Sequence, residues 1–191
     1  MARPKSEDKR NAILEAAIVV FAERGVWSTP MLAISKAAGV AEGTLFTYFF
    51  SKEVFVNELY RALKLELADV LLSAFPKSAD VRSKFQHIWE RYVNWGVANP
   101  DKLKVLAQLQ LSDQITADSK AVGRAPYAEI ERMTTDIIAS KQIRDYPVLF
   151  IAAIFNSMAE TTMATIAQDK STDTDYCAAG FEIFWKGITD H

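Results

Sequence analysis

Hydroxyl groups and a positive charge gather between residues 29 and 52, and these side chains are the best suited to binding chemistry in this sequence. Thr29, Thr44, Thr47 and Tyr48 carry hydroxyls, and Lys52 carries an ammonium group. A hydroxyl can hydrogen-bond to the edge of a nucleic-acid base or to a phosphate, and an ammonium can pair with phosphate. Which partner these groups meet depends on the elements that position them.

Residues suited to metal binding or covalent catalysis are scarce. The chain has two histidines, His87 and His191, and one cysteine, Cys177. These are too few for a recognisable zinc site, and no glycine-rich phosphate loop is present. We therefore expect no metal, no cofactor and no enzymatic activity, with an all-helical enzyme as a minor alternative. A single cysteine also excludes an intrachain disulfide, which fits a reducing cytoplasm.

Two short helices are expected to position the hydroxyl groups. The pattern predicts helices over 31–38 and 42–48, separated by Gly39-Val40, and a long helix from Lys52 to about Ala74 that Ser51 caps. Two short helices around a glycine-containing turn are typical of a helix-turn-helix, here Thr29 to Tyr48, whose second helix enters the major groove. The expected buried residues of this motif are Leu32, Ile34, Ala37, Val40 and Leu45.

The remainder of the chain also predicts helices. With seven Gly and six Pro in 191 residues, long stretches have no helix breaker. Helices are expected near 6–24, 79–98, 100–111, 119–139, 146–167 and 174–188, with Pro126 kinking or resetting its helix. The fold class is all-α with about nine helices. We place a DNA-binding helix-turn-helix domain at 1–50 and a helical bundle at 51–191.

Positive charge is local. The net charge is −2, residues 1–10 hold four cations against two acids, and residues 1–60 hold seven of each. The N-terminus lacks the apolar segment of a signal peptide, and no uninterrupted apolar run reaches the ~18 residues of a membrane span. We expect a soluble, cytoplasmic protein that does not contact membranes.

The first fifty or so residues resemble the TetR family of transcriptional regulators. The match rests on Ile34, Ala38-Gly39-Val40, Gly43-Thr44-Leu45, Tyr48-Phe49 and Ser51-Lys52-Glu53, and upstream on Ile13-Leu14, Ala16-Ala17, Phe21-Ala22 and Gly25. The resemblance implies a homodimer that binds a palindromic operator in double-stranded DNA. It also implies a repressor that a small-molecule effector releases from the operator.

The resemblance assigns DNA contacts residue by residue. The residues that it implies are Arg3, Lys5, Thr29, Glu42, Gly43, Thr44, Phe46, Thr47, Tyr48 and Lys52. Three positions depart from the family pattern. Ala41 stands where a capping serine is usual, Glu42 places an acid near phosphate, and Phe46 replaces a tyrosine. These departures concern operator preference and affinity rather than the fold.

The resemblance places effector binding and dimerisation in the later helices. Aromatic and methionine side chains suit a bulky, largely apolar or aromatic effector, and the pocket candidates are Trp89, Tyr92, Trp95, Gln108, Met133, Phe155 and Met158. The candidates for the dimer interface are Ala152, Ala159, Met163, Phe181, Phe184, Trp185 and Ile188. The same stripes are also typical of an ordinary core. A regulator with no small-molecule effector, controlled by a protein partner, is the main alternative.

Overall fold

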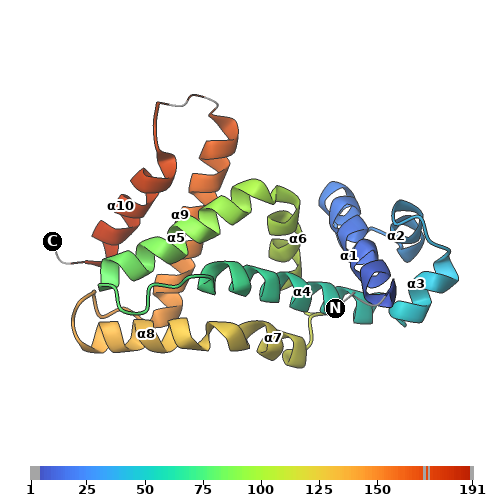
Figure 1. Cartoon of the computed structure of the whole chain (residues 1–191), viewed down its shortest axis with the longest axis horizontal. Coiled ribbons are helices and arrows are strands. Elements are labelled where there is room, and N and C mark those ends of the chain that lie inside the picture. Colours follow the sequence, from blue (N-terminus) through green and yellow to red (C-terminus); the bar gives the residue numbers. More distant parts are fainter. Residues whose placement is uncertain (1–4, 170, 172, 190–191) are drawn as a thin grey trace. The chain divides into compact units, whose positions relative to one another are not determined.

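The computed structural model describes residues 5–169, 171 and 173–189, with side chains from residue 7 onward, and every regular element in that part of the chain is helical. The fold is therefore all-α, as the sequence predicts. The elements in Figure 1 are α1 (Lys5–Arg24), α2 (Met31–Ala37), α3 (Glu42–Tyr48), α4 (Lys52–Leu72), α5 (Val81–Ala98), α6 (Pro100–Gln110), α7 (Ala117–Arg124), the 3₁₀ helix η1 (Ala125–Tyr127), α8 (Ala128–Ala139), α9 (Val148–Gln168) and α10 (Tyr176–Ile188).

Glycines and capping side chains set the ends of several helices. Gly25 follows α1 with φ 83°, and Gly39 lies in the turn after α2 with φ 66°, a conformation that costs glycine little because it has no Cβ. Asp80 caps α5 by accepting a hydrogen bond from Ser83 N at 2.9 Å. The expected helix ends agree with the observed ones to within two residues.

Pro126 interrupts the helix expected over 119–139. α7 ends at Arg124, η1 covers the next three residues, and α8 begins at Ala128. A proline inside a helix lacks an N–H donor, and its ring collides with the preceding turn. The reset at this position confirms the expectation from the sequence.

The chain forms two compact units, each built from two stretches of sequence. Unit 1 comprises 1–65 and 100–123, and unit 2 comprises 66–99 and 124–191. Helix α4 therefore contributes to both units, and α6 belongs to unit 1, where it packs against α1. These are packing units, and the functional division at 1–50 and 51–191 stays a prediction.

Three phenylalanines from separate segments form the centre of unit 1. Phe49 meets Phe55 edge to face with ring centroids 4.6 Å apart, and Phe21 meets Phe55 at 6.1 Å. Ile34 of α2 and Leu45 of α3 are fully buried. Each short helix therefore keeps an apolar side chain in the core, which stabilises the motif by removing that surface from water.

The expected inward residues of the motif are only partly correct. Leu32 is 43% exposed, Ala37 is exposed, and Val40 is half-buried. The buried residues of α2 are Met31, Ile34 and Ser35. The prediction was wrong for Leu32 and Ala37 because α2 has seven residues, too few for apolar periodicity to identify its inward face.

Helices α5, α9 and α10 pack against one another in unit 2 (Figure 1). Trp89 of α5 is fully buried and stacks on Phe184 of α10 with centroids 5.8 Å apart. Phe155 of α9 meets both rings edge to face at 5.3 Å. The indole nitrogen of Trp89 donates to the carbonyl oxygen of Cys177 at 2.9 Å, so the one polar atom of this ring is satisfied in the core.

Helix α9 is apolar along much of its length. Among the described residues it is the one helix that passes a test for membrane spans by length and composition, with a mean hydropathy of 1.3. Its buried residues are Ile151, Ala159, Thr162 and Met163, and through them it is an integral part of the unit 2 bundle. Only 22% of its apolar window is buried. A bundle helix with one uncovered apolar face passes the same test, so this result is weak evidence for a membrane span.

Candidate nucleic-acid interface

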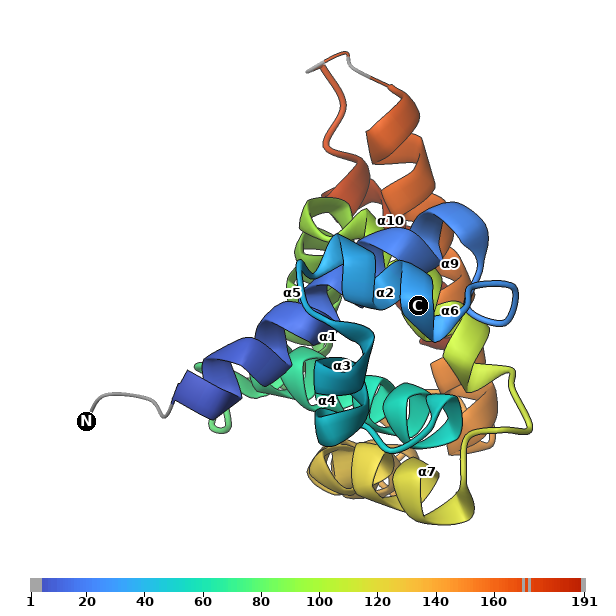
Figure 2. The same ribbon diagram turned by 90° about the vertical axis from the view of Figure 1, so that its right-hand side faces the viewer.

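The turn between α2 and α3 is held by backbone hydrogen bonds. Val40 N donates to Ser35 O at 3.0 Å, and Leu45 N donates to Ala41 O at 3.2 Å. Ala41 precedes α3 in an extended conformation and makes no side-chain cap hydrogen bond, as expected for a residue without a side-chain acceptor. Figure 2 shows the two short helices next to each other. The helix-turn-helix expected from the sequence is therefore formed.

Helix α3 turns one residue inward and leaves the others accessible. Leu45 is fully buried. Six of the predicted DNA contacts lie on this helix: Glu42, Gly43, Phe46 and Thr47 are exposed, and Thr44 and Tyr48 are half-buried. The structure thus brings these candidates together on one helix with an accessible surface, which is the geometry that a groove-reading helix requires.

Thr29 and Lys52 make hydrogen bonds that hold the segment leading into α2. Thr29 is 1% exposed, and its hydroxyl donates to the carbonyl oxygen of Gly25 at 2.7 Å. The Lys52 ammonium donates to the carbonyl oxygens of Thr29 at 2.7 Å and Trp27 at 2.9 Å, and partial burial lowers the pKa of Lys52. The prediction that Thr29 contacts phosphate through its hydroxyl is corrected, because that group is buried. Lys52 has a third proton, and its contact with phosphate stays a prediction.

The basic arm is described only near its end. Arg3 lies outside the described residues, and Lys5 begins α1 with a side chain that is not described. Arg10 forms an ion pair with Glu58 and lies 5.4 Å from the centre of the Phe49 ring. This cation is therefore neutralised within unit 1, and the DNA contacts predicted for the arm stay predictions.

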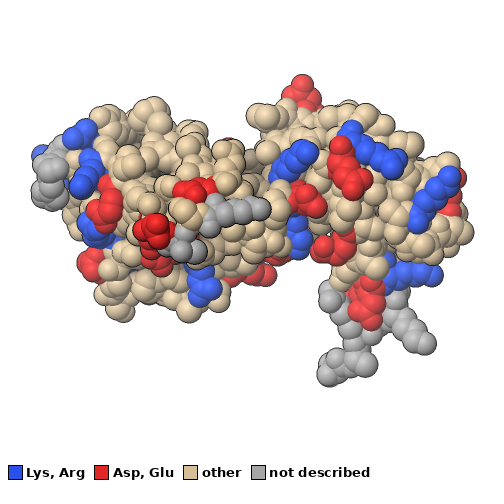
Figure 3. Space-filling model, turned by 90° about the horizontal axis from the view of Figure 1, so that it is seen from above, with Lys and Arg blue, Asp and Glu red and all other residues tan. Residues whose placement is uncertain are grey.

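Positive charge is sparse around the two short helices. Residues 25–53 hold two cations, Lys36 and Lys52, and two acids, Glu42 and Glu53. On the face drawn in Figure 3, lysines and arginines are interspersed with acidic residues rather than gathered into one patch. Counterion release from DNA scales with the number of phosphates that a protein neutralises. Between residues 25 and 53, Lys36 and Lys52 are the cations that can neutralise phosphate, so this segment offers few such contacts.

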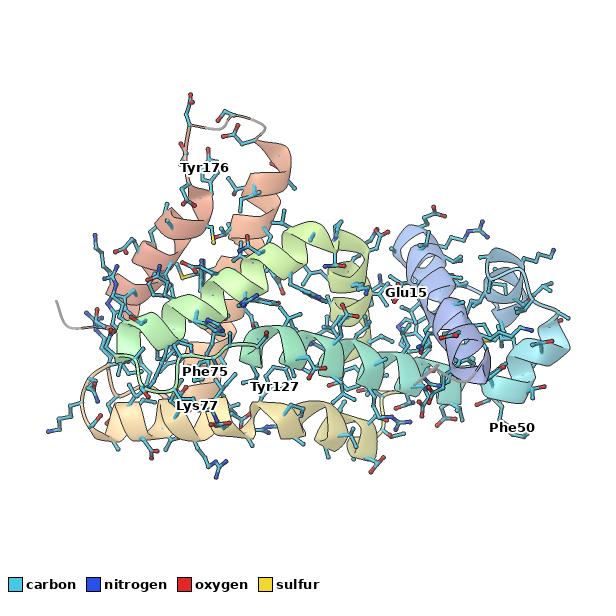
Figure 4. All side chains as sticks on the ribbon, viewed as in Figure 1. Glu15, Phe50, Phe75, Lys77, Tyr127 and Tyr176 are labelled. Atoms are coloured by element: carbon cyan, nitrogen blue, oxygen red, sulfur yellow. The ribbon has the colours of Figure 1, made fainter. Side chains whose placement is uncertain are left out.

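Gln108 of α6 supports the turn that follows α1. Its side-chain oxygen accepts a hydrogen bond from Val26 N at 3.0 Å. Helix α6 also reaches α1 through Lys102, whose ammonium lies 3.5 Å from the carboxylate of Glu15, labelled in Figure 4. Gln108 therefore belongs to unit 1, whereas the other predicted pocket residues all belong to unit 2. Sequence reasoning missed its role as a positioning residue.

Asn57 joins α4 to the segment before α7 and was not among the predicted residues. Its amide nitrogen donates to the carbonyl oxygens of Glu53 at 2.9 Å and Gln114 at 3.0 Å, and its amide oxygen accepts from Thr116 N at 2.9 Å. The side chain is nearly buried and has its hydrogen bonds satisfied, as buried amides require. In the sequence, the available sign of this structural role was the polar Asn57 next to Val56, an apolar residue that is buried.

Three predicted pocket residues form one closely packed aromatic cluster. Ring centroids of Phe155 lie 5.3 Å from Trp89 and 6.0 Å from Tyr92. Burial, with a smaller contribution from the charge of Glu160, raises the pKa of Tyr92 to about 12. The cluster is therefore neutral and filled by its own side chains, as an ordinary core would be.

The other pocket candidates have different surroundings. Trp95 is buried and donates from its indole nitrogen to Glu66 at 3.0 Å, and Met158 is half-buried on α9. Met133 lines an open groove of about 820 Å³ in unit 2. The groove is lined by Ala79, Asp80, Val81, Lys84, Glu129, Arg132, Met133, Asp136, Ile137, Ser140 and Gln142. Its lining combines apolar side chains with charges of both signs.

Most residues predicted for a dimer interface lie inside unit 2. The buried ones are Ala159, Met163, Phe181, Phe184 and Ile188, while Ala152 is exposed and Trp185 is half-buried. The accessible large apolar side chains on α9 and α10 are Leu149, Phe150, Ile154 and Ile183. The assignment of the buried residues is corrected, because periodicity marks apolar faces without showing which one packs inside the protomer.

Comparison with known proteins identifies relatives of the helix-turn-helix. The family described as "Bacterial regulatory proteins, tetR family" matches residues 13–59. The fatty acid metabolism regulator protein of Bacillus subtilis is 23% identical over 84% of this chain and 85% of its own length. The HTH-type transcriptional repressor KstR2 of Mycobacterium tuberculosis is 43% identical, over 28% of this chain and 26% of its own length.

Solved structures share the fold over nearly the whole chain. A TetR family transcription regulator from Marinobacter aquaeolei superposes with a TM-score of 0.90 at 21% identity and covers 100% of both chains. The transcriptional regulator FadR from Bacillus subtilis, solved in complex with stearoyl-CoA, superposes with a TM-score of 0.72 at 20% identity and covers 94% of this chain and 99% of its own. At these identities the likeness concerns the fold alone.

Proposed function

This chain belongs to the TetR family of bacterial regulatory proteins, and on that premise we propose that α3 reads an operator and that unit 2 controls its release. The chain is a DNA-binding transcriptional regulator, and relatives of this kind are not enzymes, so the enzyme alternative is set aside. The observation that carries the proposal is the arrangement of α3. Its buried Leu45 fixes the helix in unit 1, and its exposed residues Glu42, Gly43, Phe46 and Thr47 are free to meet base edges.

Phosphate contacts complete the proposed interface. Lys52, half-buried Tyr48 and the basic arm with Arg3 and Lys5 are the groups available to hold the DNA backbone, which fixes register without reading sequence. Two copies of the chain present two α3 helices to one palindromic operator, with half-sites 34–36 Å apart or a multiple of that spacing. A regulator of chromosomal DNA acts in the cytoplasm.

The direct experiment is selection of bound DNA. The full-length protein is mixed with sheared bacterial genomic DNA, and the retained fragments are sequenced. We expect the fragments to share an inverted repeat whose half-sites are about 10 base pairs apart, or a multiple of that distance. Recovery of fragments in proportion to their abundance, with no shared sequence, contradicts the proposal.

The uncovered apolar surface of α9 and α10 supports a homodimer. Leu149 is 70% and Ile183 is 65% exposed, and large apolar side chains that gather on a protein surface mark an interaction site. An isologous interface uses the same patch on both copies, which matches the palindromic operator. Ile183→Glu places a charge on this surface, and light scattering should then report the monomer mass. A dimer mass retained by both Ile183→Glu and Leu149→Glu contradicts this interface.

The effector is proposed to be a small amphiphile with a largely apolar part. One relative, which aligns with most of this chain, is named fatty acid metabolism regulator protein. A solved structure with the same fold is a complex with stearoyl-CoA. The groove in unit 2 offers apolar side chains such as Met133 and Ile137. Its charged lining residues are the cations Lys84 and Arg132 and the acids Asp80, Glu129 and Asp136. The proposal assigns the apolar part of the effector to the apolar side chains and its anionic end to the two cations.

A thermal-shift screen tests the effector. Fatty acids and acyl-CoA thioesters of graded chain length are the probes, with free CoA as the control. An effector at 100 times its Kd stabilises the protein by about 2.7 kcal/mol and should release the selected operator in the same concentration range. No shift and no release with any probe contradicts an acyl effector and favours control by a protein partner.

A further inference from the structure

Helix α3 lacks the side chains that most often read bases. Its seven residues are EGTLFTY, with no arginine, lysine, histidine, asparagine or glutamine among them. Arginine and lysine bind the O6 and N7 atoms of guanine, and asparagine and glutamine bind the N6 and N7 atoms of adenine. A helix without these groups cannot discriminate base pairs by the commonest hydrogen bonds. Any selectivity of α3 must come from other contacts.

The hydroxyl of Thr47 is already used inside the helix. Its Oγ1 atom donates to the carbonyl oxygen of Gly43 at 2.9 Å. A threonine that bonds to the carbonyl four residues earlier has spent its only hydroxyl hydrogen. Thr47 is exposed, so its methyl group can meet an apolar partner. Its hydroxyl oxygen can still accept a hydrogen bond but has no proton left to donate.

The other exposed side chains around α3 are largely apolar. Phe46 is 40% exposed, and Leu32 on α2 is comparably exposed. Phe50, in the turn after α3, is 87% exposed and projects away from the helices in Figure 4. Glu42 is the one charged residue of α3. The exposed part of α3 is thus mainly the Phe46 ring, the Thr47 methyl and the acid Glu42, with Thr44 and Tyr48 half-buried beside them.

We propose that α3 selects its operator through the C5-methyl groups of thymine, which the methyl of Thr47 and the ring of Phe46 contact. This inference rests on the proposed function and names the chemistry of its specificity. Among the four bases, thymine alone presents a methyl group in the major groove, and threonine methyl and phenylalanine are suitable apolar partners for it. Glu42 can accept a hydrogen bond from the amino group of cytosine and does not alter the prediction for thymine.

Deoxyuridine isolates the methyl group. It pairs as thymine does and differs only in lacking the C5-methyl. A duplex selected by the full-length protein from a random pool is synthesised with deoxyuridine at one thymine at a time, and Kd is measured by fluorescence anisotropy at fixed salt. We expect about a fourfold loss of affinity at each contacted thymine, the factor that matches burial of one methyl-sized group. Kd values within twofold of the parent duplex at every thymine overturn the inference.

Two variants of Thr47 separate its methyl from its hydroxyl. Thr47→Val keeps a methyl and removes the hydroxyl, whereas Thr47→Ser does the reverse. We expect Thr47→Val to keep the affinity of the parent and its penalty for deoxyuridine. Thr47→Ser should bind the thymine and deoxyuridine duplexes equally at one position of each half-site. The opposite pattern, with Ser like the parent and Val weakened, identifies the hydroxyl as the reading group and overturns the inference for Thr47.

Phe46→Ala tests the second contact and should lose the deoxyuridine penalty at a different thymine. Thermal unfolding of each variant confirms that it is folded, since both positions are exposed. The selection step distinguishes the two levels of the proposal. A pool from which no sequence is enriched overturns sequence-specific binding itself, whereas an enriched site that is insensitive to deoxyuridine overturns methyl readout and leaves DNA binding in place.

Discussion

The ammonium of Lys52 lies 2.7 Å from the carbonyl oxygen of Thr29, and this hydrogen bond ties the first residue of α4 to the segment that enters α2. A second bond, to Trp27 O at 2.9 Å, holds the preceding turn. Lys52 therefore has a structural role in unit 1 besides the phosphate contact that the sequence predicts. The two roles have different consequences when the charge is removed.

Lys52→Met separates these roles because it keeps the length of the side chain and removes its donors. Two carbonyl groups lose a charged partner, which should cost about 1–3 kcal/mol of unfolding free energy. Denaturant unfolding measures that loss, and Lys36→Met, an exposed lysine on α2, is the control expected to stay within ~0.5 kcal/mol. Unchanged stability together with a salt slope of DNA binding reduced by about 0.9 would identify Lys52 as a phosphate contact alone.

Gln108→Leu should destabilise unit 1 and weaken operator binding. The substitution leaves Val26 N without the acceptor that it has at 3.0 Å, and an unpaired buried donor costs about 1–3 kcal/mol. Thermal unfolding and a gel shift on the same preparation measure both effects. Gln110→Leu, an exposed glutamine of the same helix, should change neither. Equal behaviour of the two variants would show that the α6 contact does not position the reader.

The sequence predicts the helices well because several of them begin or end at a residue with a clear local reason. Gly25 adopts a positive φ, Asp80 supplies a side-chain acceptor, and Pro126 removes a donor. These effects act within one turn of the chain and can be read without knowledge of the fold. The helix-turn-helix was identifiable for the same reason.

Side-chain roles that depend on distant partners were harder to predict. Met163 looked suitable for an interface, yet it is buried against Gly96 of α5, where an added Cβ would lie 2.3 Å from its sulfur. Gln108 looked like a polar group for a ligand, yet it accepts from a backbone nitrogen 82 residues earlier. Periodicity shows that a residue belongs to a face, but only the tertiary fold shows what that face meets.

Gly180→Ala should destabilise unit 2 strongly. A Cβ at this position would lie 2.4 Å from Thr162 Oγ1 and 2.8 Å from Cζ2 of Trp89. Both neighbours are buried, so relief requires repacking that costs about 1–3 kcal/mol. Gly187→Ala on the same helix has open space and should be neutral or stabilising, because alanine favours helix more than glycine does. Denaturant unfolding compares the two, and equal stabilities would contradict the packing of α10.

Tyr92 should make stability fall at alkaline pH. Burial raises the pKa of its phenol from 10.0 to about 12 in the folded protein, so the unfolded chain releases this proton first. The stabilising contribution is complete below pH 10 and is lost as pH rises to about 12, which amounts to about 2–3 kcal/mol. Unfolding free energies of the parent and Tyr92→Phe across this range give the comparison.

Tyr92→Phe should lose that part of the pH dependence, whereas Tyr146→Phe, which alters an exposed residue of the same unit, should keep the parent profile. Identical profiles for the parent and Tyr92→Phe would show that Tyr92 ionises as readily in the folded state as in the unfolded one.

The central claim is that α3 reads the DNA. Its most direct test is the ratio of Kd for a scrambled duplex to Kd for the selected operator, measured on a variant that changes only the exposed face of α3. Thr47→Glu adds an acid where the DNA is expected, and Thr135→Glu on α8 is the matched control because Thr135 is also exposed and also donates to the carbonyl four residues earlier, at 2.9 Å. Fluorescence anisotropy gives Kd for the selected operator and for a scrambled duplex. We expect Thr47→Glu to lose its preference for the operator and Thr135→Glu to keep it. A preference retained by a folded Thr47→Glu would contradict the claim that α3 reads the DNA.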